Sequence, residues 1–371
     1  MLLTGMRTCA IGVSLALCTA CTRPTPPDEA SNIVRPVLVT DAVTDDADDP
    51  AIWINPQRPA ESLIIGTNKV AAPNGALVVF GLDGKTRQTV NGIDRPNNAD
   101  VEYGFVSRGQ PIDIVVTTER LKHRLRIFRV TSAGLTDMDA VPVLAGETGE
   151  RSEPMGIGLY RRPSDGAIFA IVSPKLGGAT NYLWQYRLDD DGRGGVKGTL
   201  VRRFGTFSER GPAPGEPGEI EAVVVDDERG VVYYADERYG IHKWHADPDH
   251  PDAAKEISLL GTDGYQLDRE GLAIYQTPGG NGFLVSSDQI PNGTIFKVYR
   301  REGEAGAPEA QRLIGEVRTP ADSTDGVEVT SAALPGFPHG MLIAMNSAGR
   351  NFMIFRWEDV EAAFLPPLHT K

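Results

Sequence analysis

The sequence predicts an all-β fold, a six-bladed β-propeller whose ring is closed by an N-terminal strand. Apolar runs opened by an acidic residue recur six times, roughly 50 residues apart, a period typical of propeller blades. The six openings are Asp49, Asp100, Glu153, Glu221, Glu270 and Asp325. An aromatic-rich strand such as LVVFGLDG or LRIFRVTSAG follows each opening in the same phase. Single blades cannot bury their own apolar faces, so they stack around one axis. A β-sandwich does not predict six such repeats.

Each blade is expected to contain four short strands, because β-branched and aromatic runs are bounded by Gly, Asp, Asn and Pro. The runs of blades one to three are residues 50–55, 62–68, 76–84 and 88–92, then 99–106, 112–119, 125–131 and 141–146, then 155–162, 167–174, 182–189 and 198–205. Those of blades four to six are 221–227, 230–237, 240–246 and 256–261, then 270–276, 282–289, 294–301 and 312–318, then 326–334, 340–347 and 352–358. Residues 34–40 are expected to supply the missing fourth strand and hide the sheet edges. A short helix is expected near Trp357–Phe364.

Length and composition fit one propeller domain over residues 33–371 of the 371-residue chain. The hydrophobic content of 40% is enough for a packed core, and 41 Gly with 27 Pro suit a turn-rich β protein. The formal net charge of −13 argues against a nucleic-acid partner, which needs a basic surface. We expect a monomer.

The N-terminal segment predicts export. Residues 1–20 resemble a signal peptide, with Arg7 followed by the apolar run AIGVSLAL. The stretch LCTAC resembles a bacterial lipobox, which places a lipid on Cys21 and a membrane tether over residues 21–32; the alternative is ordinary cleavage after Ala20. All three cysteines lie in residues 9–21, so no disulfide is expected in the domain. The expected location is the periplasm, the outer membrane as a lipoprotein, or the medium.

Acidic residues are the main candidates for chemistry. Neither a G-x-S-x-G motif nor a domain cysteine is present, and the one close histidine pair, His242 and His245, is expected to face solvent. In a propeller the six openings converge around one mouth, where like charges need counter-charge. Further acids at strand ends are Asp45, Asp46, Asp48, Asp236, Glu237, Asp268, Asp288 and Glu328. Oxygen ligands without imidazole or thiolate suit calcium.

Three basic residues indicate which kind of ligand the mouth would bind. Lys69, Arg120 and Lys175 each follow the expected second strand of blades one to three. A mouth with metal on one flank and bases on the other suits a polyanionic, phosphate-bearing ligand.

Several strings, in the same order, resemble the β-propeller phytases of bacteria: DDADDPAIWINP, TNK, NNADVEYGF, DDERGVVYYADE, DREGLAIY, STDGVEV and NFMIFRWE. The resemblance implies a six-bladed propeller that binds several calcium ions and hydrolyses myo-inositol hexakisphosphate (phytate), a 3-phytase activity. The implied calcium ligands are Asp49, Asp100, Glu221, Glu237, Asp268, Glu270, Asp325 and Asn351. The implied phosphate-holding bases are Lys69, Arg120 and Lys175. The chain departs from the family pattern at Val70, Met155, Ala222 and the shortened stretch 344–350.

The expected mechanism is attack of a metal-activated water on phosphorus, with the bases neutralising the phosphate oxygens. Glu221 or Asp268 is expected to orient that water. Two alternatives stay open at this point. One is a calcium-dependent lactonase or esterase propeller, which needs no bases at the mouth. The other is a non-catalytic propeller that binds a phosphate-bearing ligand.

Overall fold

A computed structural model of the protein describes residue 1 and residues 33–208 and 218–365. The expected signal peptide, the tether and the lipidated Cys21 lie outside the described residues. The part described below belongs to the unit Ile33–Lys371. Among the described residues, no helix combines the length and the apolar character that a membrane span needs.

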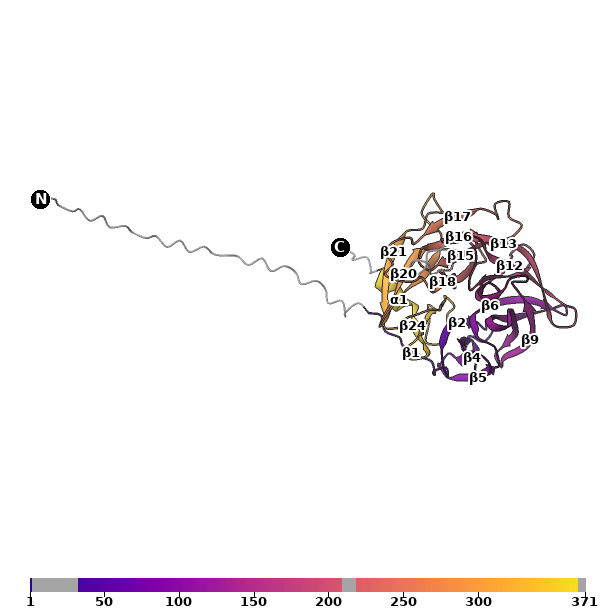
Figure 1. The fold of residues 1–371 in the computed structure, drawn as a ribbon. Helices are drawn as coiled ribbons and strands as arrows, with labels where there is room; N and C mark the ends of the chain where they lie inside the picture. The colour runs from indigo at the N-terminus through magenta and orange to yellow at the C-terminus, as the bar shows by residue number, and fades with distance from the viewer. Residues whose placement is uncertain (2–32, 209–217, 366–371) are drawn as a thin grey trace. The chain divides into compact units, whose positions relative to one another are not determined.

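Six four-stranded antiparallel sheets form the blades of a propeller, which confirms the predicted fold class (Figure 1). Blades one to three contain β2 (Ala47–Trp53), β3 (Leu63–Asn68), β4 (Ala76–Gly81) and β5 (Thr86–Asn91); β6 (Pro96–Ser107), β7 (Gln110–Glu119), β8 (Arg124–Thr131) and β9 (Gly134–Pro142); and β10 (Pro154–Arg161), β11 (Ile168–Pro174), β12 (Thr180–Asp190) and β13 (Val196–Thr206). Blades four to six contain β14 (Val223–Asp226), β15 (Val231–Asp236), β16 (Gly240–His245) and β17 (Glu256–Leu260); β18 (Leu272–Gln276), β19 (Gly282–Ile290), β20 (Gly293–Arg300) and β21 (Leu313–Thr319); and β22 (Val327–Thr330), β23 (Met341–Asn346), β24 (Asn351–Arg356) and β1 (Leu38–Val39).

The N-terminal strand closes the ring as predicted. β1 pairs antiparallel with β24, with Leu38 opposite Ile354 and Val39 opposite Met353. The C-terminal helix α1 (Trp357–Phe364) follows β24 directly, also as predicted. Its Trp357 is fully buried and stacks on Tyr275 of the fifth blade at a ring-centroid distance of 3.8 Å. The closing blade is therefore held by strand pairing on one side and aromatic packing on the other.

The core is divided into six apolar clusters, and each lies between two neighbouring blades. One cluster joins blades one and two through Ala51 and Ala99, and another joins blades six and one through Phe352 and Phe80. Inner strands are covered on both faces, so β3 is a continuous buried run, whereas the outer β5 is partly exposed. Because every blade contributes to two clusters, no blade is stable by itself.

Two expectations differ from the structure. The fourth strand of blade two is β9, which starts seven residues earlier than residue 141, because Gly134 allows a tight hairpin that pairs Thr131 with Gly134. The expectation of solvent-facing histidines is wrong for His242, which is 3% exposed. Its Nδ1 lies 2.9 Å from Glu256 Oε1, and its ring stacks on Tyr234.

Candidate active site

β-Bulges at the start of the innermost strands of blades one and two fall on pairs of polar residues. The pairing register shifts between Ala47 and Pro50 in β2 and between Pro96 and Ala99 in β6. A bulge places an extra residue in one strand and re-aims side chains, which is common beside active sites. Consecutive polar residues are therefore buried together, namely Asp48 with Asp49 and Asn97 with Asn98.

Glycines let neighbouring blades approach each other at the same end. A Cβ added to Gly326 would lie 2.3 Å from Asp49 Oδ1 and 2.5 Å from its Cα. A Cβ added to Gly271 would lie 2.5 Å from the backbone oxygen of Asp325. Both glycines directly follow an acidic opening, so the absence of a side chain brings the acidic opening of one blade against that of the next.

Lys69 lies among three carboxylates from blades one, four and six. Its ammonium contacts Asp48 and lies 3.6 Å from Asp325 Oδ2 and 3.9 Å from Glu221 Oε1. Burial opposes the charge of Lys69, but the three carboxylates outweigh burial and raise its pKa. Burial raises the pKa of Asp325 to about 7 against the opposing effect of Lys69, with Glu270 and Glu221 adding to the rise. Two of the six acidic openings, Glu221 and Asp325, therefore meet here beside Asp48.

A second group of acids offers a set of metal ligands. Carboxylate oxygens of Glu219, Glu221 and Glu237 all lie within 4.8 Å of one another. Burial and then the neighbouring Glu221 and Asp268 raise the pKa of Glu237 well above its usual value. Three carboxylates this close repel each other unless a cation or protons neutralise them. The donor set is all oxygen, so it fits a hard divalent cation.

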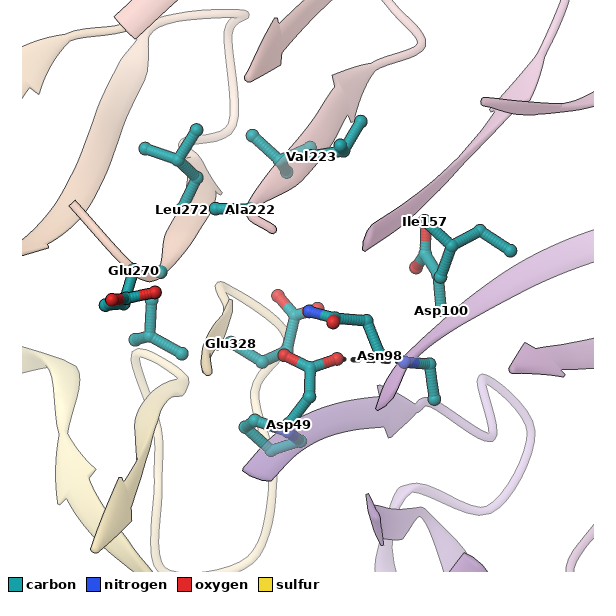
Figure 2. Close-up of a pocket in the computed structure, with 14 residues that line it drawn as sticks. Asp49, Asn98, Asp100, Ile157, Ala222, Val223, Glu270, Leu272 and Glu328 are labelled. Carbon is teal, nitrogen blue, oxygen red and sulfur yellow. Dashed lines mark hydrogen bonds between the residues drawn. The ribbon is translucent and has the colours of Figure 1, made fainter. Parts of the chain in front are cut away.

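The central pocket continues the acidic surface. Figure 2 shows Asp49, Asp100, Glu270 and Glu328 around this pocket. Burial raises the pKa of Asp100 to about 6, although the Leu159 and Val101 N–H groups donate to its carboxylate. Burial also raises the pKa of Glu270 and Glu328. The carboxylates of the mouth and pocket thus form one electronegative region.

The predicted bases lie at this end of the propeller, each in contact with an acid. Arg120 Nε donates to Glu153 Oε2 at 2.9 Å, and Lys175 forms an ion pair with Glu219. Arg120 begins a 3-10 turn (Arg120–Lys122) directly after β7, and Lys175 directly follows β11. Burial and the nearby Arg120 lower the pKa of Lys175. The bases thus belong to the same site as the acids.

Asn351 belongs to a different network. Its Oδ1 accepts a hydrogen bond from Asn346 Nδ2 at 2.8 Å, and Asn346 Oδ1 accepts one from the Asp322 N–H at 3.1 Å. Asn346 and Asn351 are paired at the turn of the β23–β24 hairpin, and Asp322 lies between β21 and β22, in the segment that joins blades five and six. This network joins the β23–β24 hairpin to the segment that leads into Asp325.

Three site residues were missed in the sequence. Asn97 donates to Glu221 from within the bulge of β6, Glu219 joins Glu221 and Glu237, and Arg238 pairs with Asp268. The sequence offers a signal for two of these residues: Glu219 lies two positions before Glu221, and Asn97 lies in the NNAD string. Their contacts cross between blades, so the sequence alone does not give them.

Two of the departures from the family pattern, Met155 and Ala222, are buried. Met155 is 1% exposed, and its carbonyl accepts from Thr118 Oγ1 at 2.8 Å. Ala222 lines the central pocket next to Glu221. Val70 follows Lys69 and places no second ammonium there.

The fold and the site define a six-bladed propeller with an acidic mouth rimmed by bases. The family described as Phytase matches residues 6–368 of the chain. A 3-phytase of Bacillus subtilis (strain 168) is 31% identical over 344 residues, which span 88% of this chain and 83% of that relative. The chain belongs to the phytase family and is a β-propeller phytase, a phosphoric monoester hydrolase. Membership of the phytase family favours a phosphoric monoester hydrolase over the lactonase-type and non-catalytic alternatives.

Proposed function

We propose that the protein removes phosphate from phytate in a calcium-dependent reaction. The observation that supports this proposal best is the convergence of carboxylates from separate blades around Lys69 and Glu221, with Arg120 and Lys175 beside them. Each phosphate carries about −1.5 to −2 charges at neutral pH, so an inositol polyphosphate is repelled by bare carboxylates. The relative's name, 3-phytase, supports the same substrate.

The residues that would hold calcium are the oxygen donors of the mouth and pocket: Asp49, Asp100, Glu219, Glu221, Glu237, Asp268, Glu270 and Asp325. Asn351 would hold calcium at the β23–β24 hairpin. Bound calcium supplies positive charge beside the phosphate oxygens and lowers the pKa of water.

The chain's own residues bind and orient the reactants. Lys69, Arg120 and Lys175 donate hydrogen bonds to the oxygens of the reacting phosphate and offset the charge that develops there. Glu221 or Asp268 accepts a hydrogen bond from the attacking water and aims its oxygen in line with the leaving inositol oxygen. The bond between the water oxygen and phosphorus forms and the ester bond breaks, and the proton that the water gives up balances the proton that the inositol oxygen takes up as it leaves as an alcohol. No covalent phosphoenzyme is required.

The decisive experiment measures inorganic phosphate released from phytate by the purified domain. Release is expected with calcium, to disappear with a chelator, and to return when calcium is added back. Phosphate release that is insensitive to chelator contradicts the calcium part of the proposal. Absence of release under every condition contradicts the substrate.

We also propose export and lipid attachment through Cys21. Incorporation of labelled palmitate into the full chain, and its loss in Cys21→Ser, is the expected result. An unlabelled wild-type chain in the medium contradicts attachment and leaves the catalytic proposal unaffected.

A further inference from the structure

A buried amide joins the two halves of the site. Asn97 is 0% exposed and lies in the bulge of β6, where pairing passes from Pro96 opposite Glu119 to Ala99 opposite Thr117. Its Nδ2 donates to Glu221 Oε1 at 2.6 Å, a contact between residues 124 positions apart. Its Oδ1 accepts from Arg120 Nη1 at 3.3 Å. One side chain therefore contacts both a carboxylate of the metal-ligand set and a base that would hold phosphate.

The hydrogen-bond partners fix the orientation of the amide. The two amide hydrogens face carboxylate and amide oxygens, since Nδ2 also lies 2.9 Å from Asn98 Oδ1 and 3.4 Å from Asp48 Oδ2. The amide oxygen faces a guanidinium, which can only donate. A group that donates to a carboxylate and accepts from a guanidinium at the same time must be neutral and carry both functions. Aspartate has no donor, and alanine has neither function.

Burial separates this role from substrate binding. A side chain with no exposed surface cannot contact an inositol phosphate, so Asn97 acts through its neighbours. Glu221 and Arg120 are each held on a second side, by Lys69 at 3.9 Å and by Glu153 at 2.9 Å. Asn97 completes the chain of contacts from Lys69 through Glu221 to Arg120 and Glu153.

We propose that Asn97 is a positioning residue that couples cation binding to phosphate binding, by orienting the Glu221 carboxylate and the Arg120 guanidinium together. This inference rests on the proposed function. Groups that orient metal ligands commonly contribute 10–100-fold to metal affinity.

The test compares Asn97→Ala and Asn97→Asp with wild type and with the control Asn55→Ala. Asn55 is a buried amide two residues beyond the end of β2, where its Oδ1 accepts from the Gln57 and Arg58 N–H groups. Calcium affinity is measured by calorimetry, KM and kcat by phosphate release from phytate at saturating calcium, and folding by urea titration.

Asn97→Ala is expected to weaken calcium binding 10–100-fold and to raise KM at saturating calcium. Asn97→Asp is expected to raise KM as well, because Arg120 pairs with the new carboxylate. Its calcium affinity should exceed that of Asn97→Ala, because the added negative charge attracts the cation. Asn55→Ala should change stability alone.

The proposal is overturned if folded Asn97→Ala keeps the wild-type calcium affinity and the wild-type KM. This holds also if Asn97→Ala loses as much stability as Asn55→Ala. Wild-type protein that releases no phosphate contradicts the proposed function instead. In that case the calcium titrations still decide whether Asn97 orients Glu221.

Discussion

In the absence of divalent cations, the folded protein should be more stable at pH 5 than at pH 8. The reason is the raised pKa of the clustered carboxyls, to about 6 for Asp100 and about 7 for Asp325. In the unfolded chain both groups titrate near their usual value of about 4. Between about pH 4 and pH 7 the folded protein therefore binds more protons than the unfolded chain, and its stability falls as pH rises.

The magnitude follows from these two values. At pH 5, relative to pH 8, the shift of Asp100 adds about 1 kcal/mol to the free energy of unfolding and that of Asp325 about 3 kcal/mol. Glu237 and Glu270, whose pKa burial also raises, act in the same direction. Carboxyls with a lowered pKa, such as Asp165 with a pKa of about 2, change the pH dependence of the free energy of unfolding little above about pH 4. Asp100 and Asp325 alone therefore make metal-free protein about 4 kcal/mol more stable at pH 5 than at pH 8, and the other carboxyls with a raised pKa add to this difference.

The assay is urea unfolding followed by fluorescence of the four tryptophans, in chelator, from pH 5 to pH 8. The midpoint should fall as pH rises, and saturating calcium should reverse the trend because protons compete with the cation. Asp325→Asn should remove about 3 kcal/mol of the dependence, whereas the exposed Asp165→Asn should leave it unchanged. A midpoint in chelator that stays constant or increases from pH 5 to pH 8 refutes the reasoning.

Three further substitutions test the site. Arg120→Ala should lower kcat/KM for phytate by about 10²–10³ without unfolding the protein, and kinetics within tenfold of wild type would exclude the assigned role. Lys69→Met leaves three carboxylates without their shared ammonium, so in chelator at pH 8 it should cost about 3–5 kcal/mol by urea titration; a loss that is no smaller at pH 5 contradicts this explanation. Gly326→Ala places a Cβ against the backbone of Asp49 and should cost about 1–3 kcal/mol. The matched control is Gly178→Ala, whose added Cβ has 3.6 Å of clearance to the Thr180 oxygen; equal stability of both variants would count against close approach of the blades.

The sequence alone determined the number of blades, the closing strand and most strand positions. These features follow from local patterns, since each blade has the same phase of apolar and turn residues and hides its faces against its neighbours. The acidic openings and the three bases could be named for the same reason, because a residue's place within a repeat fixes the end of the propeller at which it lies.

Only the tertiary structure decided which of these groups meet. The pairing of Lys69 with Asp48, Asp325 and Glu221 depends on a bulge in β2 and on ring closure. The contact of Asn97 with Glu221 crosses 124 positions, and Asn351 bonds to Asn346 across the β23–β24 hairpin. Distances across the axis are set by the packing of all six blades together. No single repeat contains that information.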